Sequence, residues 1–176
     1  MKTTPEAILA RLSALGIPHE THRHEAVFTV AQSAPVKAAI AGAHTKNLFL
    51  KDRKGSLFLV TAKDDTQIDL KRLHETIGAA SRLSFGSAEL LVSVWGVEPG
   101  SVTPLGAVND VPASVRVILD ERLMGFERVN VHPLVNTMTT GLAPSDLVAF
   151  LVATGHEPAI LALPAPPSEP DMRSGD

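Results

Sequence analysis

Cysteine is absent from this chain of 176 residues. Its absence rules out a disulfide framework, a zinc site built from thiolates and a nucleophilic cysteine, and it favours the cytoplasm. No apolar run is long enough to span a bilayer, and the N-terminus enters an amphipathic pattern instead of an apolar signal core. We therefore expect a soluble, cytoplasmic protein that has no membrane partner.

An excess of positive charge is also missing, because the formal net charge is −3. A protein that coats nucleic acid by general electrostatics needs a broad basic face, so we expect no DNA partner and only local contacts with RNA. The first half of the chain holds the basic residues that could form one such rim: Lys37, Lys46, Lys51, Arg53, Lys54, Lys71, Arg72 and Arg82. The alternative is that they are ordinary solvated charges.

Three common enzyme signatures are missing as well. The sequence has no Gly-x-Ser-x-Gly elbow, no Gly-x-x-x-x-Gly-Lys-Ser/Thr loop and no Gly-x-Gly-x-x-Gly fingerprint. The histidines at 19, 22 and 24 match no zinc spacing, and turn and helix-cap roles explain the aspartates at 64, 65 and 69. We expect neither a metal nor a cofactor.

What the chain does contain is enough apolar sequence for one domain, since 44% of its residues are hydrophobic. We place this domain at residues 1–163. The segment 164–176 has four prolines among polar residues, and we predict a disordered tail.

Periodicity and turn residues predict a mixture of helices and strands. Helices are expected over 5–15, 69–77, 87–95 and 144–153, and a capped helix starting at Val30 is expected to break at Pro35 and resume over 36–40. Strands are expected over 19–24, 46–51, 56–62, 82–85, 115–120, 128–131, 136–142 and 159–163, with a tight hairpin turn at 52–55. We expect an α+β fold with a mixed, mainly antiparallel sheet flanked by helices.

Three segments could carry chemistry. Lys46 and Asn47 stand at the entry of a strand, where a lysine can bind a phosphate or ribose oxygen, although it could equally snorkel from the strand edge. The loop 100–106 can present bare backbone N–H groups to an ester, although it could be a plain connecting turn. His132 can line a pocket or act as an acid or base, and its alternative is a structural histidine.

These segments, in this order, resemble the YbaK and prolyl-tRNA synthetase editing-domain superfamily. The resemblance rests on His24–Thr29, on His44–Leu50, on the Gly-x-x-x-Pro loop from Gly100 to Pro104, and on Val131–Leu134 with Asn136 and Thr137. It covers nearly the whole chain except the tail, and it is greatest for the freestanding branch known as ProX or PrdX. The chain departs from the family at Ala31–Gln32, where an acidic residue is usual, and at Pro35.

The resemblance implies a deacylase that removes alanine from mischarged proline tRNA. It implies that Lys46 contacts the terminal adenosine, that the backbone of Gly100 places the substrate, and that His132 shapes the amino-acid pocket together with Phe28. The further substrate-binding residues that we predict are Thr29, Asn47, Ser101 and Pro104, and the predicted tRNA-binding residues are Lys51 and Arg82. The implied partner is the acceptor end of tRNA(Pro), with prolyl-tRNA synthetase as a candidate second partner.

Two alternatives to this function remain at the level of sequence. One is the same chemistry with cysteine as the amino acid removed from tRNA(Pro). The other is a module that binds an amino acid or tRNA without catalysis.

Overall fold

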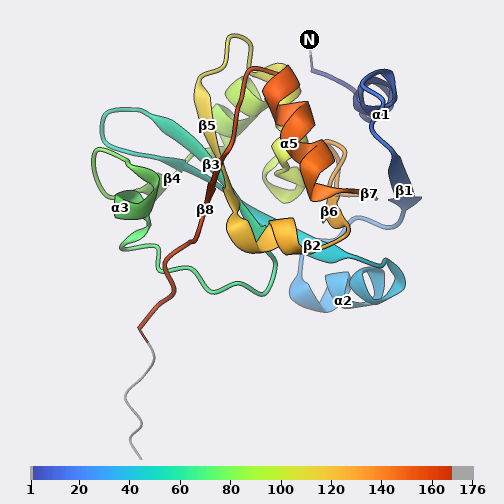
Figure 1. Ribbon diagram of the computed structural model, residues 1–176, viewed down its shortest axis with the longest axis horizontal. Helices are drawn as coiled ribbons and strands as arrows, with labels where there is room; N and C mark the ends of the chain where they lie inside the picture. Colours follow the sequence, from blue (N-terminus) through green and yellow to red (C-terminus); the bar gives the residue numbers. More distant parts are fainter. Residues whose placement is uncertain (1, 168–176) are drawn as a thin grey trace, which may run out of the picture.

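The computed structural model describes residues 2–167, which form an eight-stranded mixed sheet with helices on both faces (Figure 1). The strands are β1 (His19–Arg23), β2 (Ala43–Lys51), β3 (Leu57–Lys63), β4 (Ser84–Phe85), β5 (Val115–Asp120), β6 (Val129–Val131), β7 (Met138–Leu142) and β8 (Ala159–Leu161). Their order is β1-β7-β6-β2-β3-β5-β8, and β4 pairs with β2 at the edge. The pairs β2–β6, β3–β5 and β5–β8 are parallel, and the pairs β1–β7, β6–β7, β2–β3 and β2–β4 are antiparallel. The predicted α+β class and mixed sheet are confirmed.

The helical elements lie around this sheet. They are α1 (Pro5–Ala14), α2 (Val30–Ala39), α3 (Leu73–Ile77), α4 (Ala88–Leu90), the π-helical turn η1 (Leu91–Trp95), the 3-10 turns η2 (Pro99–Ser101), η3 (Pro104–Asn109) and η4 (Glu121–Gly125), and α5 (Pro144–Ala153). In Figure 1, α1 lies beside β1 at one end of the sheet and α3 lies at the other end.

Alternating side chains of the central strands divide the core into two layers. On β3, Leu59 packs into the larger layer with α1, α5, η1 and η3, whereas Phe58 and Val60 pack into the smaller layer with α3. Leu59 and Val60 are fully buried and Phe58 nearly so, with 1% of its surface exposed. Burial on both faces holds β3 rigidly, and β2 is paired with β3 from Thr45 to Lys51, so side chains that project from β2 have well-defined positions.

Local sequence signals explain the elements that match the expectation most closely. Thr4 caps α1 by accepting a hydrogen bond from the N–H of Ala7 at 3.1 Å, with Pro5 at the first helical position. In the β2–β3 hairpin, Oδ1 of Asp52 accepts from the N–H groups of Lys54 and Ser56, both at 3.0 Å. Turn and cap chemistry therefore specifies these parts without help from distant residues.

The predicted break at Pro35 is wrong, because α2 runs unbroken from Val30 to Ala39. Thr29 and Gln32 form a reciprocal capping box at its start, which secures the first turn. Pro35 is exposed, so the carbonyl of Ala31, which loses its helical partner there, is open to hydration. The helix predicted over 69–77 is shorter than expected, since 69–72 form turns before Leu73.

Part of the predicted tail, residues 168–176, lies outside the described residues. At its start, the carbonyl of Pro164 accepts a hydrogen bond from the N–H of Asp69 at 2.7 Å. Within residues 2–167, no helix is long and apolar enough to cross a membrane.

Candidate active site

A cleft of about 290 Å³ opens where α2 and the end of β1 face the start of β2, the end of β6 and the start of β7. Strand β6 runs parallel to β2 and antiparallel to β7, so it brings segments that are far apart in the chain to one place. The cleft is lined by His24, Val27, Phe28, Thr29, Ser33, Val36, Lys37, His44, Thr45, Asn130, Val131, His132 and Thr139.

Three histidines in this lining are oriented by backbone carbonyls. Nδ1 of His132 lies 3.0 Å from the carbonyl oxygen of Met138, and Nε2 of His44 lies 3.1 Å from that of Ile40. Because a carbonyl oxygen only accepts, the bonded ring nitrogen carries the proton in each case. The other ring nitrogen, Nε2 of His132 and Nδ1 of His44, is then an acceptor when the ring is neutral, and it has no hydrogen-bond partner within residues 2–167.

The third histidine, His24, is held at both ring nitrogens. Its Nδ1 lies 2.8 Å from the carbonyl oxygen of Glu25, and its Nε2 lies 2.8 Å from Oγ1 of Thr139. Thr139 is buried on β7, so this contact joins the segment after β1 to the floor of the cleft.

Burial lowers the pKa of His132 below its ordinary value of 6.5, and the nearby rings of His24 and His44 lower it further. The hydrogen bond with Met138 acts in the opposite direction. The imidazole of His132 is therefore neutral near pH 7, and it offers the lone pair of Nε2 to a ligand.

The Gly100 loop borders the cleft and is held from beneath. Nδ2 of Asn47 donates to the carbonyl of Val102 at 3.1 Å, and Nε1 of Trp95 donates to the carbonyl of Thr103 at 2.7 Å. Oδ1 of Asn47 accepts from Oγ1 of Thr61 at 2.6 Å, which fixes the orientation of the amide. The buried sheet thus positions the loop that carries Gly100.

Gly100 has little room for a side chain. A Cβ built there would lie 3.3 Å from Nδ2 of Asn136 and 3.4 Å from Cε1 of Phe28, which lines the cleft. The backbone of Gly100 is exposed and therefore stands beside the cleft entrance.

The structure brings Phe28, Thr29 and His132 together in the cleft wall, with Gly100 against Phe28. Thr29 also caps α2, with its Oγ1 accepting from the N–H of Gln32 at 3.1 Å. Asn47, Ser101 and Pro104 do not line the cleft. Asn47 anchors the loop, whereas Ser101 and Pro104 are buried in η2 and η3.

Lys46 projects from the face of β2 opposite to Thr45 and Asn47, on the same face as His44. Its Nζ donates to the carbonyl of Thr66, in the turn after β3, and it does not line the cleft. The neighbouring Asp64 pairs with Lys37 of α2 at 2.6 Å, so this turn adjoins the margin of the cleft.

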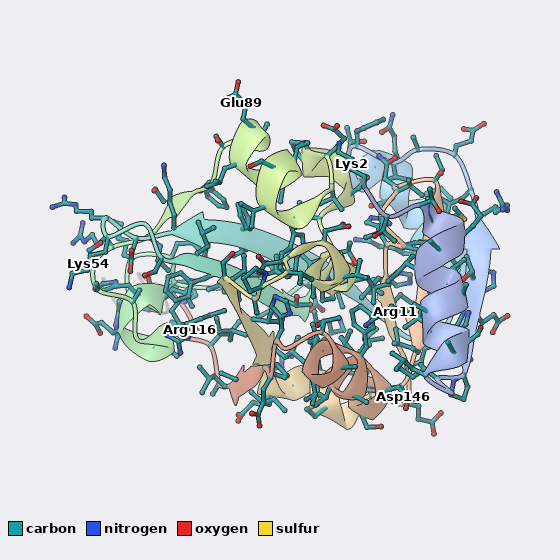
Figure 2. All side chains as sticks on the ribbon, turned by 90° about the horizontal axis from the view of Figure 1, so that it is seen from above. Lys2, Arg11, Lys54, Glu89, Arg116 and Asp146 are labelled. Atoms are coloured by element: carbon teal, nitrogen blue, oxygen red, sulfur yellow. The ribbon has the colours of Figure 1, made fainter. Side chains whose placement is uncertain are left out.

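Lys51 and Arg82 share a second hollow, of about 480 Å³, with Arg53. It lies at the hairpin end of the sheet. Figure 2 shows Lys54 at this end, on the opposite side of the molecule from β1 and α1. Three cationic side chains therefore border one concave surface there, although the whole chain is acidic.

Several cleft residues were not among the predicted site residues. They include His24, His44, Thr45, Asn130 and Thr139. His44 and Thr45 adjoin Lys46 in the sequence, which was the available signal, but only the pairing of β6 between β2 and β7 shows that Asn130 and Thr139 belong beside them. Within the described chain, no group of three His, Asp or Glu side chains is arranged to hold a metal ion.

The domain has an α+β fold, and its mixed sheet carries a histidine-lined cleft beside the exposed Gly100 loop. Such a cleft can bind a small polar group. Residues 24–150 match the aminoacyl-tRNA editing domain family. The chain belongs to this family.

Individual relatives agree with this assignment. The prolyl-tRNA synthetase associated domain-containing protein 1 of Mus musculus is 40% identical over 155 residues, which cover 86% of this chain and 91% of the mouse protein. The prolyl-tRNA editing protein ProX of Acetoanaerobium sticklandii is 36% identical over 152 residues, which cover 86% and 92%. A crystal structure of a candidate trans-editing enzyme for prolyl-tRNA synthetase has the same fold, with a TM-score of 0.69 at 22% identity and coverage of 93% and 99%.

Proposed function

We propose that this protein hydrolyses mischarged aminoacyl-tRNA(Pro) in trans, with alanine as the amino acid removed. The family and the names of the mouse and Acetoanaerobium relatives support the tRNA(Pro) part of this proposal. The choice of alanine rests on the resemblance to the ProX branch and on the walls of the cleft.

The observation that carries the proposal is the pair of histidine ring nitrogens in the cleft that have no hydrogen-bond partner within residues 2–167. The free nitrogens of His44 and His132 are hydrogen-bond acceptors without negative charge. The α-ammonium group of an aminoacyl ester is a compact donor of three hydrogen bonds, which suits such acceptors. The exposed backbone of Gly100 lies against Phe28, which lines the same cleft, and from there it can approach the ester carbonyl.

Selection by size follows from the cleft walls. Phe28 and His132 both line the cleft. A substrate side chain that is too large for the cleft loses more binding free energy than one that is too small. A cleft that fits the methyl group of alanine thereby excludes the ring of proline, which protects correctly charged tRNA(Pro).

The chemistry requires no protein nucleophile. Water attacks the ester carbonyl, the bond between that carbonyl and the ribose oxygen breaks, and the ribose oxygen takes up the proton released by the water. A neighbouring ribose hydroxyl assists this proton transfer. An aminoacyl ester is already activated, so positioning and oriented donors are enough to accelerate its hydrolysis.

Lys46 is the residue that we assign to the terminal nucleotide. A lysine ammonium is a mobile point charge on a flexible stem, and within residues 2–167 the one hydrogen-bond partner of Nζ of Lys46 is the carbonyl of Thr66. We infer that it exchanges this carbonyl for a phosphate or ribose oxygen when tRNA binds. Lys51 and Arg82 then contact the acceptor stem in the second hollow.

The decisive experiment measures the rate of alanine release from Ala-tRNA(Pro), with Cys-tRNA(Pro), Ala-tRNA(Ala) and Pro-tRNA(Pro) alongside. Lys46→Ala is expected to abolish release while circular dichroism and thermal unfolding show an intact fold. Arg11→Ala, at an exposed cation on α1 outside the predicted basic rim, is the control and is expected to retain the rate.

The outcomes separate the alternatives. Release from Cys-tRNA(Pro) in preference to Ala-tRNA(Pro) would change the assigned amino acid and leave the reaction class standing. Binding of tRNA without release from any substrate would identify a non-catalytic module. Full activity of Lys46→Ala would remove this lysine from the site.

A further inference from the structure

Two of the six phenylalanines in this chain are unusually exposed. Phe28 and Phe85 have 74% and 60% of their surface exposed, whereas Phe49, Phe58 and Phe150 are buried. Phenylalanine seldom stays in water without a ligand or partner, because its burial is strongly favourable. Phe28 lies against Gly100, and Phe85 shares a hollow with Pro99 and Val102, so the two rings flank the same loop.

The hollow at Phe85 has a volume of about 230 Å³ and a mainly apolar lining, with Asn47 at one margin. Its floor is closely packed, since a Cβ at Gly86 would lie 2.5 Å from Cδ1 of Phe49. The N–H of Gly86 also donates to the carbonyl of Phe49 at 2.9 Å. The backbone that carries Phe85 is therefore held against β2.

The position of this hollow is set by β2. Thr45 lines the cleft, Asn47 and Phe49 line the hollow, and Lys51 lines the basic hollow. Alternate residues of a strand share one face, so the same face of β2 contributes a residue to each of these three concave surfaces, and the cleft also takes His44 from the other face. At the rise of a strand, the distance from Thr45 to Lys51 is about 20 Å.

We propose that the hollow at Phe85 binds a nucleobase of the single-stranded 3′ end of tRNA, directly before the terminal adenosine. This inference rests on the proposed function. A strand whose stem lies on Lys51 and Arg82 and whose aminoacyl group lies in the cleft passes this hollow, which offers an aromatic face and an apolar wall of Pro99 and Val102. Bases stack on such faces without a strong sequence requirement.

A nucleobase suits the hollow better than a protein segment does. The hollow is small and continuous with surfaces that bear cations on one side and acceptors on the other, which matches a chain of phosphates ending in an aminoacyl group. In this arrangement the ring of Phe85 is exposed when tRNA is absent, and the nucleobase covers it when tRNA is bound.

The first test compares Phe85→Ala, Phe85→Trp and wild type on two substrates, Ala-tRNA(Pro) and alanyl-adenosine, which lacks the preceding bases. Phe85→Ala is expected to raise KM for the tRNA about tenfold, in the range for one lost stacked base, and to leave kcat unchanged. Hydrolysis of alanyl-adenosine should not change, and Phe85→Trp should keep the wild-type KM. Val152→Ala, an exposed apolar residue on α5, is the matched control. An unchanged KM for the tRNA in Phe85→Ala, or an equal loss on both substrates, would overturn the proposal.

A second test does not depend on catalysis. An uncharged acceptor-stem RNA minihelix ending in CCA is titrated against wild type and Phe85→Ala, together with the same minihelix carrying an abasic penultimate nucleotide. Each change alone is expected to weaken binding about tenfold, and the two together should weaken it no further, because both remove one contact. Additive losses would refute stacking on Phe85. Normal minihelix binding with no deacylation of any charged tRNA would instead refute the proposed function and leave the base site standing.

Discussion

Two regions of this molecule use histidine in opposite ways. His156, directly after α5, is 4% exposed and bonded at both ring nitrogens: Nε2 lies 2.8 Å from Oδ2 of Asp110 and Nδ1 lies 3.0 Å from Oγ1 of Thr154. In the cleft, His44 and His132 each use one ring nitrogen to contact a backbone carbonyl. The buried His156 has hydrogen-bond partners at both ring nitrogens. His44 and His132 are each oriented by a hydrogen bond at one ring nitrogen, and their other ring nitrogen is available to a ligand.

The surroundings of the two regions differ in the same way. The ring of Trp95 packs edge-on against His156, with centroids 5.7 Å apart at 88°. Asp110 also accepts from the N–H and Oγ of Ser114, at 2.9 and 2.6 Å, and from the N–H of Val115 at 2.9 Å. The cleft is instead bordered on one side by α2, which begins with a polar capping box and has mostly exposed residues. The cleft is therefore less deeply buried than the surroundings of His156. The buried region favours stability, and the cleft leaves polar groups free for binding.

The largest effect on stability is expected for Asp110→Ala. Removing the carboxylate leaves the buried ring of His156 and the buried N–H of Val115 without an acceptor, which should lower the free energy of unfolding by about 3–5 kcal/mol. Urea unfolding measures this loss, and the rate of deacylation per folded molecule should stay at the wild-type value. Asp65→Ala, at an exposed ion pair with Lys63, is the control and should change stability little. A low rate in the folded fraction of Asp110→Ala would break the division between the two regions.

His132→Ala is expected to alter selectivity more than stability. Removing the ring enlarges the cleft, so aminoacyl groups larger than alanine should gain about tenfold in hydrolysis relative to alanine. Competition between differently charged tRNA(Pro) substrates measures this ratio. His22→Ala is the matched control, because His22 lies on β1 and contacts Glu20 outside the cleft. Unchanged selectivity would remove His132 from the wall.

The smallest expected effect is that the cleft and the buried Asp110–His156 pair respond to acid in different pH ranges. Since the pKa of His132 is lowered from 6.5, its neutral form stabilises the folded protein above pH 6.5, and this contribution is lost as the pH falls through the lowered value. Burial alone raises the pKa of Asp110, but hydrogen bonds from Ser114 and His156 lower it more, to below 3.8. The contribution of Asp110 is present above pH 3.8 and is lost only at lower pH.

As the pH falls below 6.5 and through the lowered pKa of His132, the rate of alanine release should therefore decline while the fold remains intact. The rate is measured from pH 5 to 8 beside circular dichroism, and His132→Asn should flatten the decline on the acidic side. Parallel loss of rate and structure would show that the cleft and the buried pair respond to acid together.

Much of the fold was predictable from local sequence. The Thr4 cap of α1, the prolines that begin α1 and α5, the Asp52 turn and the strands of the central hairpin all depend on residues that are near neighbours. The continuous α2 was not predicted, because proline was weighed as a breaker without the capping box that stabilises the first turn. The second half of the helix predicted over 87–95 is the π-helical turn η1, a difference that its sequence does not signal.

For the candidate site, the resemblance indicated Phe28, Thr29 and His132, and all three line the cleft. It did not indicate Asn130 or Thr139, which come to the cleft from β6 and β7. The positions of Asn47 and Lys46 on opposite faces of β2 follow from strand alternation, once the strand is known to begin at Ala43.

The sequence by itself determined the turns, the caps and the family resemblance, because each depends on residues that are close along the chain. Only the tertiary structure decided which histidines keep a nitrogen free. That depends on whether a distant group reaches the ring: Asp110 meets His156 across 46 positions in the chain, whereas within residues 2–167 no side chain reaches Nε2 of His132. Long-range packing fills one polar site and leaves the other open to a ligand.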